Sequence, residues 1–196
     1  VYYGYDTVHM TGYNAVGSVV QNNNFDQDEM MTTDLIDYVA MVPSYTHRGA
    51  GSHYESQHTL ASLLLHGRAY MSELDTRTHT AVVRAHGRQR SVHEAVEILK
   101  RDTASLIMDG VGGWFGDWTT LGPRGVGYFS DPQVLKTIAK AKQIYDKTID
   151  LPRESRAQIA VFVSGKAWFH HDAVIAPPIY HNIIRGMMYE QLPKIG

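Results

Sequence analysis

Short apolar runs of strand length recur through the first 109 residues of the chain. They predict strands at 1–5 (VYYGY), 36–42 (IDYVAMV), 68–73 (RAYMSE) and 104–109 (ASLIMD). The first two runs are rich in the β-branched and aromatic residues that favour strands. The starts of the runs lie 35, 32 and 36 residues apart, which is the length of a strand, a crossover helix and their loops. The pattern therefore predicts an α/β fold with a parallel sheet, either half of a (β/α)8 barrel or a small doubly wound sheet.

Apolar residues recur with helical spacing between the last two predicted strands and again after the last one. The segment 91–102 (SVHEAVEILKRD) begins with Ser91 and Glu94, which form the capping-box pattern S-x-x-E. Its predicted apolar stripe consists of Val92, Ala95, Val96 and Leu99. The stretches before 36 and before 68 have room only for short or broken helices, and 21–29 (QNNNFDQDE) is predicted to be a loop.

A second long helix is predicted over 130–149 (SDPQVLKTIAKAKQIYDKTI). Ser130 or Asp131 is its expected N-cap, with Pro132 in the first turn. The apolar stripe of this helix is expected to contain Val134, Leu135, Ile138, Ala139 and Tyr145.

The pattern of predicted elements changes after residue 150. LPRES reads as a linker, 157–164 (AQIAVFVS) as a buried strand, and 179–192 (IYHNIIRGMMYEQL) as a helix. We therefore expect a domain boundary near 151–156, with one domain over 1–152 and the start of a second over 153–196. Because the chain opens directly into a predicted strand and stops just after a predicted helix, we expect it to be part of a larger protein.

Composition narrows the possible partners. The chain of 196 residues is 43% hydrophobic and 19% charged, which is an ordinary composition for a globular protein with a core. A net charge of -2 gives no electrostatic argument for nucleic acid or an anionic membrane. No apolar run approaches the length of a membrane span. The absence of Cys excludes disulfides and thiolate metal sites.

Polar and aromatic residues follow each of the four predicted strands. They are Tyr5 and Asp6; Ser44, Tyr45 and Arg48; Glu73, Asp75 and Arg77; and Asp109 and Trp114. In parallel α/β sheets, functional side chains gather at the carboxyl ends of the strands. The third group, continued by His79, has the spacing of two that places side chains on one face of an extended chain. We therefore expect this stripe to face a site.

Carboxylates, arginines and aromatic rings together suit the recognition of a sugar. One carboxylate attacks the anomeric carbon, and a second carboxylic acid protonates the leaving oxygen. The glycine-rich stretch DGVGGWFGDW (109–118) supplies aromatic side chains that suit the lining of a cleft. Two structural alternatives remain open at this point. Glu73 could form an ion pair with Arg68 or Arg77, and Trp114 with Phe115 could cap the core.

The sequence gives little support for a metal or a cofactor. In FHHD (169–172), adjacent histidines on an extended chain point to opposite sides, so both rarely bind one ion. The glycines of DGVGGWFG lead into aromatic residues and not into a helix, which disfavours a dinucleotide site. We expect no metal and no cofactor.

Several longer motifs carry a resemblance to a known family. The segments VYYGYD, DYVAMVPSYTHRGAG, LLLHGRAYMSELDTRTH, LIMDGVGGWFGDW and YFSDPQVLKTIAKAKQIYDK follow one another in order. Over about 1–165 they resemble the later barrel of bacterial β-galactosidase-like glycoside hydrolases related to family 42. The resemblance implies strands five to eight, the C-terminal half, of a (β/α)8 TIM barrel. From 157 onward the chain resembles the start of the flavodoxin-like trimerisation domain of these proteins, which implies a homo-oligomer.

The resemblance also implies roles for the residues at the strand ends. Glu73 falls where this group carries the nucleophile of a retaining β-glycosidase, acting on an oligosaccharide or another β-glycoside. Substrate-binding roles are then expected for Tyr5, Tyr45, Arg48, Arg68, Asp75, Arg77, Asp109 and Trp114. The family's acid/base Glu lies in an Asn-Glu pair that this sequence lacks. The alternative is a carbohydrate-binding or scaffold protein without catalysis.

Overall fold

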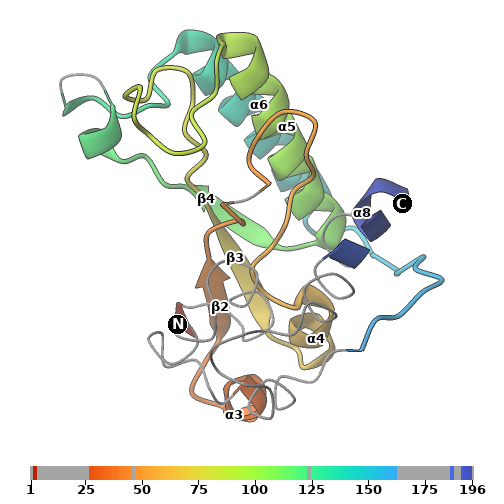
Figure 1. Ribbon diagram of the computed structural model, residues 1–196. Helices are drawn as coiled ribbons and strands as arrows, with labels where there is room; N and C mark the ends of the chain where they lie inside the picture. The colour runs from red at the N-terminus through yellow and green to blue at the C-terminus, as the bar shows by residue number, and fades with distance from the viewer. Residues whose placement is uncertain are drawn as a thin grey trace, which may run out of the picture. The chain divides into compact units, whose positions relative to one another are not determined.

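The computed structural model describes residues 2–3, 27–45, 47–122, 125–162, 186–187 and 191–195 (Figure 1). The chain divides into two compact units. The first unit contains Val1–Met41, Glu55–Tyr70 and Ser155–Gly196, and the second contains Val42–Tyr54 and Met71–Glu154. No helix in the described ranges has the length and hydropathy needed to cross a membrane.

A parallel pair of strands lies in the first unit. Strand β1 (Tyr2–Tyr3) pairs with β2 (Tyr38–Met41), with Tyr2 opposite Val39. Helix α3 (Gln27–Thr32) precedes β2, and helix α4 (Leu60–Leu65) precedes the next strand. Both helices are short, as the sequence predicted, although α3 begins inside the segment expected to be a loop. The apolar residues of β2 are buried, so this strand belongs to the core of its unit.

Arg68 stabilises the turn between α3 and β2 through hydrogen bonds to its backbone. Its Nε donates to the carbonyl oxygen of Met31 at 2.8 Å, and Nη1 donates to that of Ile36 at 2.8 Å. A third donor, Nη2, reaches the carbonyl oxygen of Thr33. These bonds satisfy backbone acceptors at the end of a short helix, so Arg68 has a structural role in its unit.

A second parallel pair organises the second unit. Strand β3 (Ala69–Leu74) pairs with β4 (Gly112–Phe115) in a register that sets Glu73 opposite Trp114. Helix α5 (Val92–Asp109) connects the two strands, which makes a β-α-β unit. The α/β class with a parallel sheet is therefore confirmed.

The strand predicted at 104–109 is wrong, because these residues are the last turns of α5. Ile98, Leu99, Asp102 and Leu106 are its buried residues beyond the first turn, and they recur at helical spacing. Gly110, with φ of 69°, ends the helix in the left-handed conformation that glycine accepts without a steric penalty. The strand that follows is β4, three residues beyond the predicted run.

Helices α5 and α6 (Pro132–Thr148) pack against each other and run side by side in Figure 1. Ser91 caps α5 by accepting from the backbone N–H of Glu94 at 3.2 Å, as the capping box predicted. Asp131 is the cap of α6, and its Oδ1 accepts from the N–H groups of Gln133 and Val134. Residues of both helices and of the loops around them form one core cluster, which contains Ala81, Ala85, Ala95, Leu99, Tyr128, Phe129 and Val134. Leu135, expected in the apolar stripe, is half exposed.

Two shorter elements complete the described chain. A 3-10 turn covers Thr119–Leu121, and α8 covers Leu192–Ile195. Residues 157–162 form no strand, contrary to the prediction, while 163–164 and most of the predicted helix 179–192 lie outside the described residues. The proposed domain boundary near 151–156 stays a prediction.

Candidate functional site

Four of the residues expected to bind substrate lie together in the second unit. Asp75, the residue after β3, is 1% exposed, and each of its carboxylate oxygens faces a guanidinium group. Oδ1 lies 2.6 Å from Nη1 of Arg48, and Oδ2 lies 2.9 Å from Nη1 of Arg77. Tyr45 completes the group, which we call the Asp75 cluster (Tyr45, Arg48, Asp75 and Arg77).

Arg48 is the most constrained member of the Asp75 cluster. It is 2% exposed, and its Nε and Nη2 donate to the carbonyl oxygens of Ser44 at 3.2 Å and Pro43 at 2.8 Å. Its Cζ lies 3.7 Å from the centre of the Tyr45 ring, and the Cζ of Arg77 lies 5.3 Å from the same ring. Both distances are within the range of a cation–π interaction. The tyrosine ring is therefore held by two cations, of which Arg48 is itself fixed.

Glu73 occupies the second-last position of β3 and is 8% exposed. Its register partner Trp114, which is 36% exposed, lies next to it on the same face of the parallel pair. Gly116 follows β4 closely, and a Cβ atom there would lie 2.7 Å from Oε1 of Glu73. The absence of a side chain at Gly116 therefore leaves the space that the Glu73 carboxyl occupies. Gly116 belongs to the glycine-rich stretch 109–118, but its closeness to Glu73 was not predicted from the sequence.

Asp109 does not join this group, contrary to its expected position at a strand end. It is the last residue of α5 and precedes β4, so it lies at the opposite end of that strand from Gly116. Partial burial raises the pKa of its carboxyl, although much of the residue is exposed. The error follows directly from the helical 104–109 segment, because a residue placed after a strand in the prediction precedes one in the structure.

Tyr128, which was not predicted from the sequence to be a site residue, holds together the two chain segments that carry the site. Its buried hydroxyl lies 2.6 Å from the carbonyl oxygen of Gly116 and 3.1 Å from that of Asp75. Its backbone N–H donates to Oδ1 of Asp117 at 2.7 Å. Burial, reinforced by the charge of Asp75, raises the pKa of the Tyr128 hydroxyl well above its ordinary value of 10.0. Tyr128 thus ties the chain after β3 to the chain after β4.

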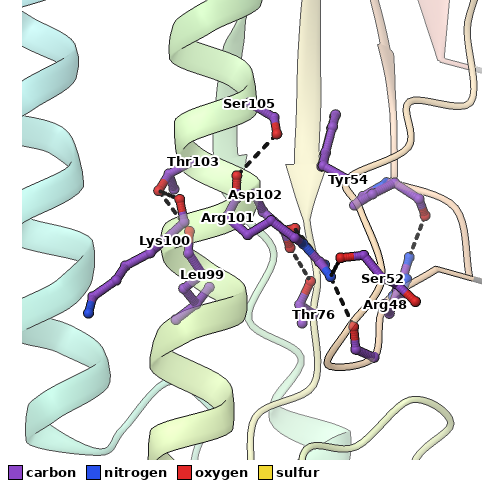
Figure 2. A network of polar contacts seen from close by, with 12 residues as sticks. Arg48, Ser52, Tyr54, Thr76, Leu99, Lys100, Arg101, Asp102, Thr103 and Ser105 are labelled. Atoms are coloured by element: carbon purple, nitrogen blue, oxygen red, sulfur yellow. Dashed lines mark hydrogen bonds and ion pairs between the residues drawn. The ribbon is translucent and has the colours of Figure 1, made fainter. Parts of the chain in front are cut away.

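A second buried carboxylate, Asp102 of α5, anchors the loop that carries Arg48. Figure 2 shows Arg101 between Asp102 and the loop at Ser52. Nη2 of Arg101 lies 2.7 Å from Oδ1 of Asp102, and the Thr76 hydroxyl donates to Oδ2 at 3.2 Å. Nη1 of Arg101 donates to the carbonyl oxygens of Gly49 at 3.0 Å and Ser52 at 3.1 Å. Burial raises the pKa of Asp102 against the opposing effect of Arg101.

The remaining predicted residues lie elsewhere. Arg68 belongs to the first unit, where it binds backbone carbonyls, and Tyr5 and the FHHD motif lie outside the described residues. His79, at the end of the polar stripe, lies with Nε2 3.4 Å from Oδ2 of the helix cap Asp131.

The described chain is thus an α/β protein with a buried carboxylate–arginine cluster at the carboxyl end of β3. No family model, no curated protein and no solved structure matches it.

Proposed function

We propose that this chain carries the nucleophile half of a retaining β-glycosidase site, with Glu73 as the nucleophile. The observation that carries the proposal is the position of Glu73, beside the partly exposed Trp114 and with its carboxyl in the space left by Gly116. The β-α-β connection of this unit is compatible with part of a (β/α)8 barrel, in which catalytic groups lie at the carboxyl ends of strands. The resemblance of the chain to β-galactosidase-like enzymes suggests the substrate class.

In this mechanism the Glu73 carboxylate attacks the anomeric carbon of a β-linked sugar and forms a glycosyl ester as the leaving oxygen departs. The indole of Trp114 offers an apolar face to the C–H side of the sugar ring. Arg77, which is less buried than Arg48, is the member of the Asp75 cluster best placed to donate to a hydroxyl. Tyr45 contributes a ring held by two cations.

The same mechanism needs a general acid that this chain does not supply at the expected place. Asp75 is the nearest carboxylate in sequence, but both of its oxygens are engaged by guanidinium groups. Because these two ion pairs engage both oxygens, Asp75 is not placed to act on a leaving oxygen. We therefore propose that the acid/base belongs to a part of the protein outside this chain. This agrees with the sequence, which lacks the Asn-Glu pair that carries the acid/base in the family it resembles.

A substrate that needs no general acid tests Glu73 directly. Dinitrophenolate departs without protonation, and a fluorine beside the anomeric carbon slows hydrolysis of the glycosyl ester. The chain is incubated with a dinitrophenyl 2-fluoro-β-galactoside, and intact mass and peptide mapping follow. We expect one fluorosugar attached at Glu73.

Glu73→Gln is expected to fold and to remain unlabelled, because an amide oxygen is a poor nucleophile. Glu97→Gln, which changes an exposed glutamate of α5 in the same way, is expected to label like the wild type. An adduct on Glu73→Gln, or no adduct on the wild type with the folded state confirmed by circular dichroism, would remove Glu73 from the nucleophile role.

The second candidate is sugar binding without catalysis. It is favoured by the ion pairing of both Asp75 oxygens, which engages the carboxylate that is nearest to Glu73 in sequence. Binding of galactosides that persists in Glu73→Gln, together with no labelling of the wild type, would select this alternative.

A further inference from the structure

We propose that Arg77 binds a carboxylate group of the substrate, so that the sugar cleaved or held at this site is a β-linked uronic acid. The inference rests on the proposed function and deepens it, because it names the substrate class of the same site. The guanidinium of Arg77 uses Nη1 for its ion pair with Asp75 at 2.9 Å. Within the described part of the chain, its Nε and Nη2 donate to no acceptor.

Other arginines in the interior of the second unit use their nitrogens on the protein itself. Arg48 donates from Nε and Nη2 to backbone carbonyl oxygens at 3.2 and 2.8 Å, and Arg88 does the same at 2.7 and 2.6 Å. Arg101 combines two such bonds with its ion pair to Asp102. The Arg77 side chain is 12% exposed, and leaving donors of a mostly buried charged group unused costs free energy. A ligand that accepts from these donors recovers that free energy.

The charge of the Asp75 cluster indicates the class of ligand. Two guanidinium groups share one carboxylate in this cluster, so one positive charge is unmatched among its members. A carboxylate brings one negative charge, and its two oxygens match the planar edge that Nε and Nη2 of an arginine present. A hydroxyl brings no charge, and a phosphate group brings nearly two. The cluster therefore favours a carboxylate over both.

Tyr128 connects Arg77 with the carboxyl of Glu73. The Tyr128 hydroxyl lies 2.6 Å from the carbonyl oxygen of Gly116, the residue whose missing side chain leaves space for the Glu73 carboxyl. Burial and the charge of Asp75 raise the pKa of this hydroxyl, and the charge of Arg77 acts in the opposite direction, so the guanidinium lies close to it. In a pyranose, the anomeric carbon and the carbon that bears the exocyclic group are both bonded to the ring oxygen. The carboxylate of a uronic acid therefore lies next to the end of the sugar that meets Glu73.

The position of Arg77 is fixed before a ligand binds. Its backbone carbonyl oxygen accepts from the N–H of Gln89 at 3.0 Å, and the flanking Thr76 and Thr78 are buried. Its Cζ lies 5.3 Å from the centre of the Tyr45 ring. A side chain held in this way loses little conformational entropy when it binds a carboxylate.

The test is isothermal titration calorimetry of the full chain with two probes that differ in one group. Methyl β-galacturonide carries a carboxylate where methyl β-galactoside carries a hydroxymethyl group. We expect the uronide to bind about 10-fold more tightly or better, which is the scale of a hydrogen bond to a charged group. Arg77→Gln should remove most of this preference. Arg77→Lys, which keeps the charge but not the planar fork, should retain part of it.

Arg84→Gln is the matched control, because it removes an exposed arginine of the same unit and should keep the full preference. The comparison of the two probes on the unaltered chain decides the question even if Arg77→Gln does not fold. Equal affinities for the two probes, or tighter binding of the 6-phosphate of methyl β-galactoside, would overturn the inference. So would a preference for the uronide that survives in folded Arg77→Gln.

These outcomes are distinguishable from failure of the nucleophile role of Glu73. A preference for the uronide without fluorosugar labelling at Glu73 would support the carboxylate site and reject the nucleophile. Labelling at Glu73 with equal affinities for the two probes would support the nucleophile and reject the carboxylate site.

Discussion

The carboxylate of Asp75 joins two arginines from different parts of the chain, with Oδ1 2.6 Å from Nη1 of Arg48. The side chains of Asp75 and Arg48 are each 2% exposed. A second ion pair, Lys142–Asp146, has the same 2.6 Å separation but is largely exposed on α6. Burial, and not distance, therefore distinguishes the two pairs, and their contributions to stability should differ accordingly.

Asp75→Asn is expected to lower the free energy of unfolding by about 3–5 kcal/mol, because it leaves a buried guanidinium without its countercharge. Asp146→Asn should change the free energy of unfolding by at most about 1 kcal/mol, since exposed pairs contribute little. Urea denaturation of both variants provides the measurement. Equal losses would mean that the buried arrangement of Asp75 and Arg48 is not what stabilises this unit.

Gly116→Ala should displace the Glu73 side chain, because the added Cβ would lie 2.7 Å from Oε1. We expect a loss of about 1–3 kcal/mol from the crowding and loss of labelling by the activated fluorosugar. Gly49→Ala is the control, since nothing lies within 4 Å of its Cβ position, and its stability should stay within about 0.5 kcal/mol of the wild type. A Gly116→Ala protein that labels normally would show that Glu73 does not need this space.

Tyr128→Phe tests the buried hydroxyl and its pH dependence. At neutral pH the variant should be about 1–3 kcal/mol less stable, because the carbonyl oxygens of Gly116 and Asp75 lose a donor. The pKa of Tyr128 is raised in the folded state, so the unfolded chain releases this proton first. The hydroxyl therefore stabilises the fold fully below the ordinary pKa of 10.0, and this contribution declines as the pH rises above it.

The difference in urea midpoint between the wild type and Tyr128→Phe should accordingly be smaller above pH 10 than at neutral pH. A difference between the two proteins that stays constant or widens with pH would contradict the raised pKa of this hydroxyl.

Gly110→Ala should destabilise the end of α5 in two ways. The residue has φ of 69°, and its Cβ position lies 2.7 Å from Cδ of Arg153. The guanidinium of Arg153 donates to the carbonyl oxygens of Ile107 and Thr148, so a displaced Arg153 would also release the ends of α5 and α6. We expect a loss in the free energy of unfolding above the roughly 1–2 kcal/mol of a left-handed residue.

Gly67→Ala separates the two effects. Gly67 follows α4 with the same φ of 69°, but nothing lies within 4 Å of its Cβ position. Its substitution should cost only the left-handed penalty, about 1–2 kcal/mol. If thermal unfolding gives equal losses for Gly67→Ala and Gly110→Ala, the contact with Arg153 has no energetic consequence.

The helix starts were predictable because capping is a local interaction. Ser91 and Glu94 are close in sequence, and Asp131 caps N–H groups two and three residues ahead. The apolar run 104–109 was misassigned because a short buried run fits a strand as well as the last turns of a buried helix. That single error also moved Asp109 to the wrong end of a strand. Nothing within the run itself distinguishes the two alternatives.

By itself, the sequence determined the α/β class, the caps of α5 and α6 and the polar stripe after β3, because propensity, periodicity and capping act over a few residues. It also placed Asp75 and Arg77 two residues apart, where an extended chain brings them together. Only the tertiary structure decided that Arg48 is the second partner of Asp75 and that Gly116 makes room for Glu73. It also decided that the Tyr128 hydroxyl bonds the backbone after β3 and after β4. Each of these contacts joins residues at least twelve positions apart or on different elements. Such contacts depend on how the elements pack, and the spacing of residues along the chain does not encode that packing directly.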